Sequence, residues 1–335
     1  SKKSFQSKIV IKNDMKIFVL IMGITGVYVS SSFIRLEVFA SISLIILTSI
    51  GLSILTKEIF KINLSKRNSY SLKISYVLVI FTLFLIPLFV PTNSNWVSAV
   101  DVPPTILTGA TNHPASDDWL ATLEWIKLNT PENSVVASWW DYGYWIQSLS
   151  ERATLADNST IDSLTIKNIA KIFLTSPNDG WKLLQEMNAD YLVVFVAGER
   201  LDATYNDEQL YYLGHGGDES KVYWFIRIAE LSEQKYFEYD SNILSNNFWN
   251  ETLLGEMIPF HTATYYNAEL QRETSTYQPG FLPLSVKDIK YSDSKNDPLW
   301  LVYASPSFHD EKPGSMSGVF VYEINKNYVP TEPNS

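Results

Sequence analysis

Two tryptophans followed by an aspartate, Trp139-Trp140-Asp141, are the side chains of this sequence that could most directly recognise a ligand. They place two indole N–H donors, one carboxylate acceptor and a large apolar surface in a single short stretch. A hydroxyl group both donates and accepts hydrogen bonds, so this set could bind a Ser or Thr side chain, whose methyl the rings would cover. Tyr142 and Gly143 complete the run. The alternative is an aromatic corner of a core, although a carboxylate is costly to bury there without a partner.

A second segment could form the opposite wall of such a pocket. Asp218 and Lys221 lie three residues apart, and the apolar stretch that follows them carries Phe225 and Ile228, either of which could contact a methyl group. On its own, the Asp-Lys pair would be interpreted as a surface ion pair. Its interpretation as part of a site therefore depends on the Trp-Trp-Asp run.

Arg35 lies in a short link between two apolar segments. An arginine at the edge of a bilayer commonly extends its guanidinium into the interface. A guanidinium fork also suits phosphate oxygens, and the diphosphate of a lipid carrier would lie at this depth. Both interpretations stay open.

A strand and two helices are expected to position the Trp-Trp-Asp run. Residues 134–138 resemble a short buried strand, 162–174 and 177–187 are predicted helices, and 191–196 is a second strand. This order indicates a βαβ-type unit with parallel pairing. Ligands bind beyond the carboxyl ends of such strands, which is where the run lies.

The remaining elements of this part of the chain are predicted from caps and periodicity. We expect a helix capped by Ser116 and ended by Pro131, a turn or helix cap at 157–160, a polar loop at 198–217, a strand at 223–228, mostly helix at 232–257, and strands at 299–303 and 319–324.

Three apolar segments, residues 17–34, 36–56 and 74–91, each approach the roughly 18–20 residues that cross a bilayer. They are too many and too closely spaced for a cleaved signal peptide. The sequence therefore predicts three transmembrane helices. Because the chain opens with Ser just ahead of the first of them, we also expect a fragment whose N-terminal part is missing.

Charge is distributed very unevenly along the chain. Residues 1–91 hold 11 Lys and Arg against 3 Asp and Glu, whereas residues 92–335 hold 15 against 33. The basic residues before the first span and between the second and third predict that these segments are cytoplasmic, so that Arg35 and everything after residue 91 face outside. The acidic outer part argues against a nucleic acid partner.

Several classes of site are missing from the sequence. It contains no cysteine, so no disulfide holds the outer part together. The four histidines are scattered, and we find no glycine-rich phosphate loop and no paired carboxylates with the spacing of metal ligands.

The predicted fold class is a set of multi-pass membrane helices followed by an extracytoplasmic mixed α/β domain with a smaller β-rich C-terminal unit. The expected divisions are membrane helices at 1–91, a linker at 92–114, an α/β core at 115–258 and a β-rich peripheral unit at 259–335.

Taken together, these motifs resemble the catalytic subunit of oligosaccharyltransferase in its archaeal form. The resemblance rests on Ser138 to Trp145, on Asp157 to Thr160, on Asp218-x-x-Lys221 with its Trp-Phe-Ile-Arg-Ile continuation, and on the surroundings of Arg35. It spans roughly residues 17 to 330 and corresponds to the C-terminal portion of that family. Members transfer an oligosaccharide from a dolichyl diphosphate-type lipid carrier to Asn of Asn-x-Ser/Thr.

The resemblance implies roles for individual residues. Trp139, Trp140 and Asp141 would bind the hydroxyl of the acceptor's Ser or Thr, and a second motif at Lys221, Phe225 and Ile228 would complete that pocket. Arg35 would bind the donor's diphosphate. Tyr142, Gly143 and Asp218 support the motifs. Phe225 stands where the family usually has Met, which puts that contact in doubt.

The resemblance also implies a metal cofactor, and it limits what this chain can do on its own. The family uses Mn²⁺ or Mg²⁺ bound by carboxylates that precede the membrane helices present here, so no metal ligand is expected in this chain. We therefore expect the chain to be inactive alone. The implied partners are an acceptor polypeptide, a lipid-linked oligosaccharide and the cell membrane.

Two other functions are compatible with the sequence. A non-catalytic, membrane-anchored protein that binds peptides or glycans would suit the 10 Trp, 19 Tyr and 17 Phe. A transporter fragment would account for the three spans but not for the large outer part or the Trp-Trp-Asp run.

Overall fold

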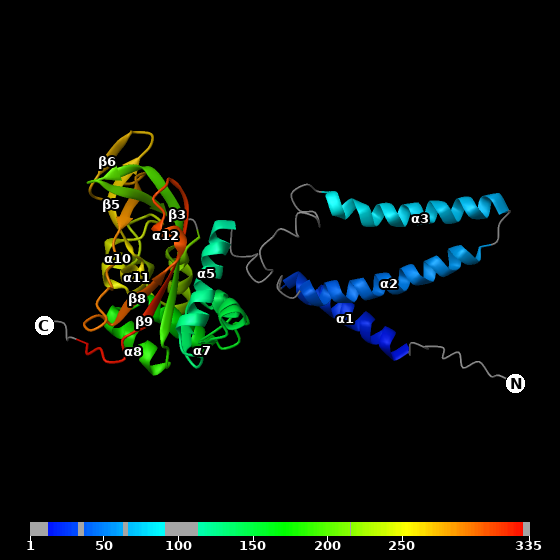
Figure 1. Ribbon diagram of the computed structural model, residues 1–335, viewed down its shortest axis with the longest axis horizontal. Helices are drawn as coiled ribbons and strands as arrows, with labels where there is room; N and C mark the ends of the chain where they lie inside the picture. The colour runs from blue at the N-terminus through cyan, green and yellow to red at the C-terminus, as the bar shows by residue number, and fades with distance from the viewer. Residues whose placement is uncertain (1–12, 33–36, 63–65, 91–112, 215, 331–335) are drawn as a thin grey trace. The chain divides into compact units, whose positions relative to one another are not determined.

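The computed structural model describes residues 13–32, 37–62, 66–90, 113–214 and 216–330 (Figure 1). It divides into two compact units, Ser1–Asp101 and Val102–Ser335. Each unit is described by itself. Arg35 lies outside the described residues.

The first unit consists of the apolar helices α1 (Asn13–Ser32), α2 (Glu37–Lys61) and α3 (Lys66–Phe89). Helices α1 and α2 pack closely at Gly23, where an added Cβ would lie 3.3 Å from Leu47. Tyr76 of α3 and Thr56 of α2 share a hydrogen bond of 2.6 Å between their hydroxyls. Most other apolar side chains of these helices are exposed, as expected of helices that face lipid.

Two stretches of these helices are long and apolar enough to cross a membrane, Ala40–Lys61 and Ser69–Phe89. They correspond to the second and third predicted spans. The first predicted span, 17–34, falls on α1, whose apolar part Ile17–Tyr28 is shorter, and its residues 33 and 34 lie outside the described part of the chain.

The second unit is a mixed α/β domain, and this order of apolar helices followed by an α/β domain confirms the predicted fold class (Figure 1). Its helical segments are α5 (His113–Asn129), η3 (Trp140–Tyr142), α6 (Gly143–Trp145), η4 (Ile146–Ser150), α7 (Ser163–Leu174), α8 (Pro177–Glu186), η5 (Asp218–Lys221), α9 (Val222–Ala229), η6 (Glu233–Lys235), α10 (Asn246–Glu251), α11 (Leu253–Met257) and α12 (Pro306–His309). Its strands are β1 (Val135–Ala137), β2 (Ala153–Thr154), β3 (Tyr191–Tyr205), β4 (Glu208–Leu213), β5 (Phe260–Asn267), β6 (Arg272–Thr274), β7 (Leu282–Lys287), β8 (Leu299–Ala304) and β9 (Gly314–Ile324).

These strands form one nine-stranded sheet. Its order is β2-β1-β3-β4-β7-β5-β6, with β9 pairing with both β3 and β8. Strand β1 is parallel to β2 and to β3, which confirms the predicted βαβ-type unit, and the remaining pairs are antiparallel. Helices α7 and α8 supply the connection from β2 to β3.

Strand β9 lies at the centre of the domain. It pairs with β3 from Tyr191↔Glu323 to Arg200↔Gly314, and α5 packs against it, as Figure 1 shows. The expected division at residue 258 falls inside the compact unit, between α11 and β5, so the separation into a core and a peripheral unit stays a prediction.

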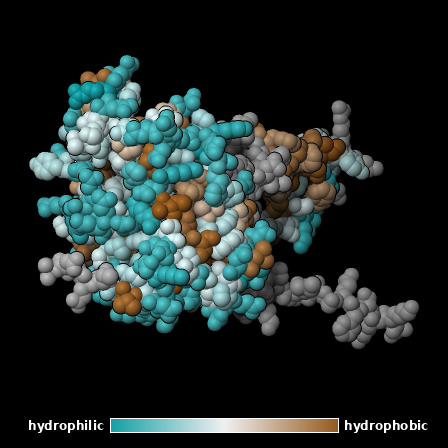
Figure 2. Space-filling view, turned by 60° about the vertical axis from the view of Figure 1, so that its left-hand side comes forward, coloured by the Kyte–Doolittle hydropathy of each residue, from teal (hydrophilic) through white to brown (hydrophobic). Residues whose placement is uncertain are grey.

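The surface and the interior of the α/β domain differ sharply in the kinds of side chain that they contain. Figure 2 shows that most of the visible face of the α/β domain is hydrophilic, with small hydrophobic patches among the polar residues. The core beneath combines aliphatic side chains of β3 and β9 with many aromatic rings, among which Trp119, Phe173 and Phe320 are fully buried. A core that is rich in rings gives the site a rigid support.

Several helix boundaries follow from caps that are visible in the sequence. Asp162 accepts hydrogen bonds from the amides of Leu164 and Thr165 at the start of α7, and Ser176 caps α8 ahead of Pro177. The strands expected at 299–303 and 319–324 are confirmed as β8 and the end of β9. Helix α5 begins at residue 113, three residues before the cap expected at Ser116.

Two segments were predicted wrongly, and a third only in part. Residues 198–217 were expected to be a loop, but most of them form the hairpin of β3 and β4. Residues 223–228 were expected to be a strand, but they belong to helix α9. The stretch 232–257 contains short helices joined by turns rather than mostly helix.

Candidate functional site

The Trp-Trp-Asp run lies directly after the carboxyl end of β1, as predicted. Trp139 precedes the single turn of η3, in which the amide of Tyr142 donates to the carbonyl of Trp139 at 3.0 Å. The chain then continues into α6 at Gly143. The run is therefore held in a short helical turn at the edge of the sheet.

The two indole rings of this run stack on each other. Their centroids are 3.8 Å apart with an interplanar angle of 29°. Trp139 and Trp140 are only 7% and 6% exposed. Neither indole N–H donates a hydrogen bond within the described residues, and neither belongs to the fully buried polar atoms without a partner, so both N–H groups retain contact with solvent. The rings are buried on their faces while their donors stay accessible.

Phe225 supports both indoles from helix α9. Its ring lies edge-on to Trp139 at 4.9 Å and to Trp140 at 6.2 Å, and it contacts Phe173 of α7 on another side. Phe225 is 0% exposed, whereas Ile228, one turn later on the same helix, is only half-buried. Of these two residues, Ile228 is therefore the one that an incoming ligand can reach.

Asp218 and Lys221 of η5 meet the first motif at Tyr142. The buried carboxylate of Asp218 accepts hydrogen bonds from the Tyr142 hydroxyl and from Lys221 Nζ, both at 2.8 Å, and its other oxygen accepts from the amide of Phe195 at 2.8 Å. Lys221 Nζ also donates to the Tyr142 hydroxyl. Burial, followed by the charge of Asp218, raises the pKa of Tyr142 well above its ordinary value. Tyr142 therefore stays protonated and serves as a donor.

Lys221 is surrounded by aromatic rings. Its Nζ lies 4.7 Å from the ring centre of Tyr142, 5.4 Å from that of Trp139 and 5.9 Å from that of Phe195. Ring faces attract a cation, and the ion pair with Asp218 compensates part of the cost of burying both charges. The two motifs are thus joined through one buried network.

Gly143 is required by the path of a neighbouring segment. A Cβ at this position would lie 2.4 Å from the carbonyl oxygen of Ala156 and 2.6 Å from the Cα of Asp157. The backbone of Gly143 is ordinary helical, with φ −55°, so lack of space excludes a side chain here rather than an unusual conformation. Asp157 itself forms the predicted turn by accepting from the amide of Ser159 at 2.9 Å, while the helix cap belongs to Asp162.

Sequence reasoning missed three aromatic residues that position the site. Trp119 of α5 contacts the ring of Tyr142 at 4.5 Å, Phe195 of β3 contacts Trp119 at 5.7 Å, and Phe173 contacts Phe225 at 4.9 Å. The sequence placed Trp119 and Phe173 only on predicted helices. No local signal showed that they would lie beneath the site.

Metal ligands do not gather in the parts of the chain that the structure describes. No group of three or more His, Asp or Glu side chains there could hold a metal ion. Asp141 is half-buried beside the indoles.

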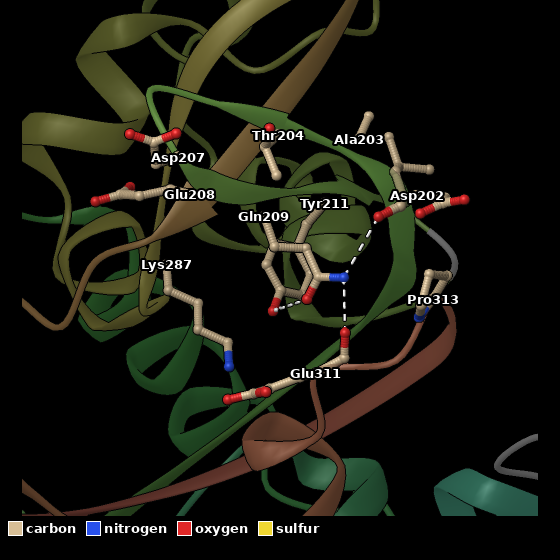
Figure 3. Close-up of a pocket in the computed structure, with 11 residues that line it drawn as sticks. Asp202, Ala203, Thr204, Asp207, Glu208, Gln209, Tyr211, Lys287, Glu311 and Pro313 are labelled. Carbon is tan, nitrogen blue, oxygen red and sulfur yellow. Dashed lines mark hydrogen bonds between the residues drawn. The ribbon is translucent and has the colours of Figure 1, made fainter.

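A cavity of about 580 Å³ on the β-rich side of the domain has an acidic rim (Figure 3). Two polar side chains of its lining, Gln209 and Lys287, form hydrogen bonds with the protein itself. The Gln209 amide bridges the carbonyls of Leu201 and Glu311, and Lys287 donates to the carbonyl of Phe308 while its ammonium lies 4.5 Å from that ring. Burial lowers the pKa of Lys287. Gln209 and Lys287 therefore have partners within the domain, and we interpret both side chains as structural supports.

Comparison with known proteins finds a family model that matches part of this chain and relatives that match more of it. A model described as the STT3/PglB/AglB core domain matches residues 132–194, which contain the Trp-Trp-Asp run. The STT3 subunit of the dolichyl-diphosphooligosaccharide–protein glycosyltransferase from Saccharomyces cerevisiae is 26% identical over 304 residues, covering 84% of this chain and 40% of the yeast protein. The corresponding stt-3 subunit of Caenorhabditis elegans is 24% identical over 300 residues, covering 76% of this chain and 37% of the relative.

Solved structures of oligosaccharyltransferases from Archaeoglobus fulgidus are also similar to this chain. A C-terminal globular domain matches with a TM-score of 0.33 and 19% identity, covering 62% of this chain and 96% of that domain. An oligosaccharyltransferase tethered to an acceptor peptide with an NVT sequon matches with a TM-score of 0.34 and 14% identity, covering 86% of this chain and 38% of that protein.

The chain spans about two fifths of the length of the curated relatives that it matches. The match to the core domain falls on the segment that carries the first motif, and the relatives extend over most of the chain. Residues 132–194 therefore match the STT3/PglB/AglB core domain, and the chain is a homologue of the STT3 subunits.

Proposed function

We propose that this chain is part of an enzyme that transfers an oligosaccharide from a lipid carrier to Asn of Asn-x-Ser/Thr, and that its site binds the Ser or Thr hydroxyl. The observation that carries the proposal is the pair of stacked indoles at the end of β1, whose N–H groups are both accessible beside the carboxylate of Asp141. The homology to STT3 glycosyltransferase subunits supports the reaction class.

Each residue of the site has a role in this proposal. Trp139 and Trp140 donate to the hydroxyl oxygen and Asp141 accepts its proton, which uses the full hydrogen-bonding capacity of the group. Ile228 faces the methyl of Thr, and Phe225 fixes the indoles from below.

The network of Tyr142, Asp218 and Lys221 holds the two motifs in register. Its hydrogen bonds join η3 to η5, from which α9 starts.

The donor and the metal ion involve residues that the structure does not describe. Arg35 binds the donor's diphosphate in this proposal. The described residues offer no ligand set for a metal ion, so the Mn²⁺ or Mg²⁺ implied by the resemblance does not fit here, and we assign no step to it. Its ligands would lie in a part of the enzyme other than this chain, and the chain alone would be inactive.

The proposed location is the cell membrane, with the α/β domain on the extracytoplasmic side. The two apolar helices of membrane-spanning length support the membrane location, and the basic residues of 57–73 support the orientation. The acceptor polypeptide and the lipid-linked oligosaccharide would meet on that outer side. The homology to STT3 subunits favours this enzyme over a non-catalytic binding protein.

A transfer assay with the full-length enzyme tests the proposal. Asp141→Asn should raise the KM for an Asn-x-Thr peptide at least about tenfold, since it removes the acceptor for the hydroxyl proton. Asp202→Asn, a change of an exposed carboxylate, serves as the matched control. Equal KM values for the two variants would contradict the proposal.

A further inference from the structure

A separate cavity of about 320 Å³ is lined in part by residues of η5, and Tyr142 is not among its lining residues. Its apolar wall includes Leu213, Leu244 and Trp249, and its polar lining includes Glu219, Ser220 and Ser285. Asp218 and Lys221 of η5 bind Tyr142, whereas the intervening Glu219 and Ser220 line this cavity. The first and last residues of this turn thus contact Tyr142, and its two middle residues line the cavity.

Glu219 is buried without full compensation. The side chain is 5% exposed, its Oε1 accepts a long hydrogen bond of 3.2 Å from the amide of Gly214, and its Oε2 has no hydrogen-bond partner within the described residues. A buried carboxylate without full compensation is costly, so a cation that enters the cavity and pairs with this carboxyl group would be bound favourably.

Gly217 leaves the space that the carboxyl group occupies. A Cβ on Gly217 would lie 2.2 Å from Oε2 and 2.6 Å from Oε1 of Glu219. The backbone there is extended, with φ −68° and ψ −176°, so space rather than conformation excludes a side chain. The loop therefore allows the carboxyl group to fold against it at the border of the cavity.

The lining of the cavity indicates the charge of its occupant. Among the described residues that line it, Glu219 is the only one with a carboxyl group, and none is Lys, Arg or His. The nearest base in the sequence, Lys221, is engaged with Asp218 and Tyr142. The hydroxyl of Ser220 donates to the carbonyl of Gly217 at 2.6 Å, so its oxygen can still accept. The described lining therefore offers acceptors and one ionisable carboxyl group, but no cation.

We propose that this cavity binds the side chain of a lysine from a polypeptide, with its ammonium on Glu219 and its four-carbon stem along Leu213, Leu244 and Trp249. An ammonium group has three donors, which suits the carboxyl group of Glu219 and the hydroxyl oxygens of Ser220 and Ser285. The stem is apolar and gains from burial against the aliphatic and indole surfaces. This inference stands apart from the acceptor site, since none of the residues proposed to bind the hydroxyl line the cavity.

Binding of an ammonium would release a proton. Burial, with the neighbouring charge of Asp218, raises the pKa of Glu219 to about 8, while backbone hydrogen bonds and the charge of Lys221 oppose this shift. Tyr212 is the other titratable side chain in the lining. Near pH 7 the carboxyl group is mostly protonated, so an ammonium that pairs with its charged form displaces about one proton.

Calorimetric titration of the full chain with N-acetyl-lysine-methylamide tests this inference. Saturable binding is expected, with about one proton released near pH 7, as measured by comparing phosphate and Tris buffers. The association constant should rise about tenfold between pH 6 and pH 7, because the ligand stays charged while Glu219 ionises. The norleucine analogue, which lacks the ammonium, should bind at least tenfold more weakly.

Glu219→Gln should weaken binding of the lysine probe at least tenfold and abolish the proton release. Glu132→Gln, at an exposed position that does not line the cavity, should bind like the unchanged protein. Absence of saturable binding, equal binding of the norleucine analogue, or unchanged binding by Glu219→Gln would overturn the inference. The pH series and the norleucine comparison use the unmodified protein, so they decide the matter even if the variant does not fold.

Discussion

Tyr142 and Asp218, 76 residues apart in the sequence, share a buried hydrogen bond of 2.8 Å that joins the two motifs of the site. The bond connects the turn after β1 to the turn before α9. Lys221 completes the contact by donating to both partners. The orientation of the indoles toward α9 therefore depends on a polar network as well as on ring packing.

Tyr142→Phe tests this network. The variant keeps the ring contacts with Trp119 and Trp145 but removes the hydroxyl between Asp218 and Lys221. Loss of one buried, charge-assisted hydrogen bond should lower the free energy of unfolding by about 1–3 kcal/mol. Thermal unfolding followed by near-UV circular dichroism measures the effect. An unchanged unfolding temperature would show that the hydroxyl contributes nothing to stability.

Lys221→Met should destabilise the domain by about 3 kcal/mol, because it leaves the buried carboxylate of Asp218 without its cation. The double variant Asp218→Asn/Lys221→Met removes both charges and should recover part of this loss. The free energies of unfolding of Asp218→Asn, Lys221→Met and the double variant, compared with that of the unchanged protein, form a double-mutant cycle. If the stability losses of the two single variants added up to the loss of the double variant, Asp218 and Lys221 would not be energetically coupled.

Gly143→Ala should destabilise the site by about 1–3 kcal/mol through overpacking, because its Cβ would meet the carbonyl oxygen of Ala156. Gly51→Ala is the control, since nothing lies within 4 Å of a Cβ added there. Thermal unfolding should separate the two variants clearly. Similar unfolding temperatures would mean that the 156–157 segment moves aside without cost.

Glu219 should make stability depend on pH. Its pKa is raised in the folded state to about 8 from an ordinary 4.5, so the folded protein holds this proton more tightly than the unfolded chain does. Its contribution to stability is therefore present below pH 4.5 and is lost as the pH rises toward 8. The unfolding temperature of the Glu219→Gln variant should change less between pH 5 and pH 8 than that of the Glu132→Gln control. Parallel pH profiles would contradict this assignment.

The sequence predicted those parts of the fold that local signals determine. The helices expected at 162–174 and 177–187, the buried strand before Trp139 and the parallel pairing of β1 with β3 are confirmed. Each depends on residues within a few positions of one another, or on the βαβ rule for consecutive elements. The position of the first motif at a strand's carboxyl end could therefore be derived without the structure.

Helix α9 was missed because its sequence, Val-Tyr-Trp-Phe-Ile-Arg-Ile, is rich in β-branched and aromatic residues. Its buried positions are 222, 225, 226 and 229, which is the spacing of one helix face. Packing against α7 decides the conformation, and this contact is not visible in the local composition.

The hairpin of β3 and β4 carried a signal that was overlooked. Asn206 and Asp207 at its tip both have positive φ, 51° and 69°, which two-residue hairpin turns require and which Asn and Asp tolerate. Long-range contacts had no such signal. Nothing in the sequence placed Phe195 or Trp119 beneath Tyr142, because those contacts depend on the complete sheet.

The most direct test of the central claim is the affinity of the full chain for two peptides, Asn-Ala-Thr and Asn-Ala-Val, with blocked ends. Val has the shape of Thr without the hydroxyl, so only the proposed contacts of Trp139, Trp140 and Asp141 should distinguish the two. We predict that the Thr peptide binds about 10- to 100-fold more tightly and that Trp140→Phe reduces this preference. Equal affinities for the two peptides would contradict hydroxyl recognition at this site.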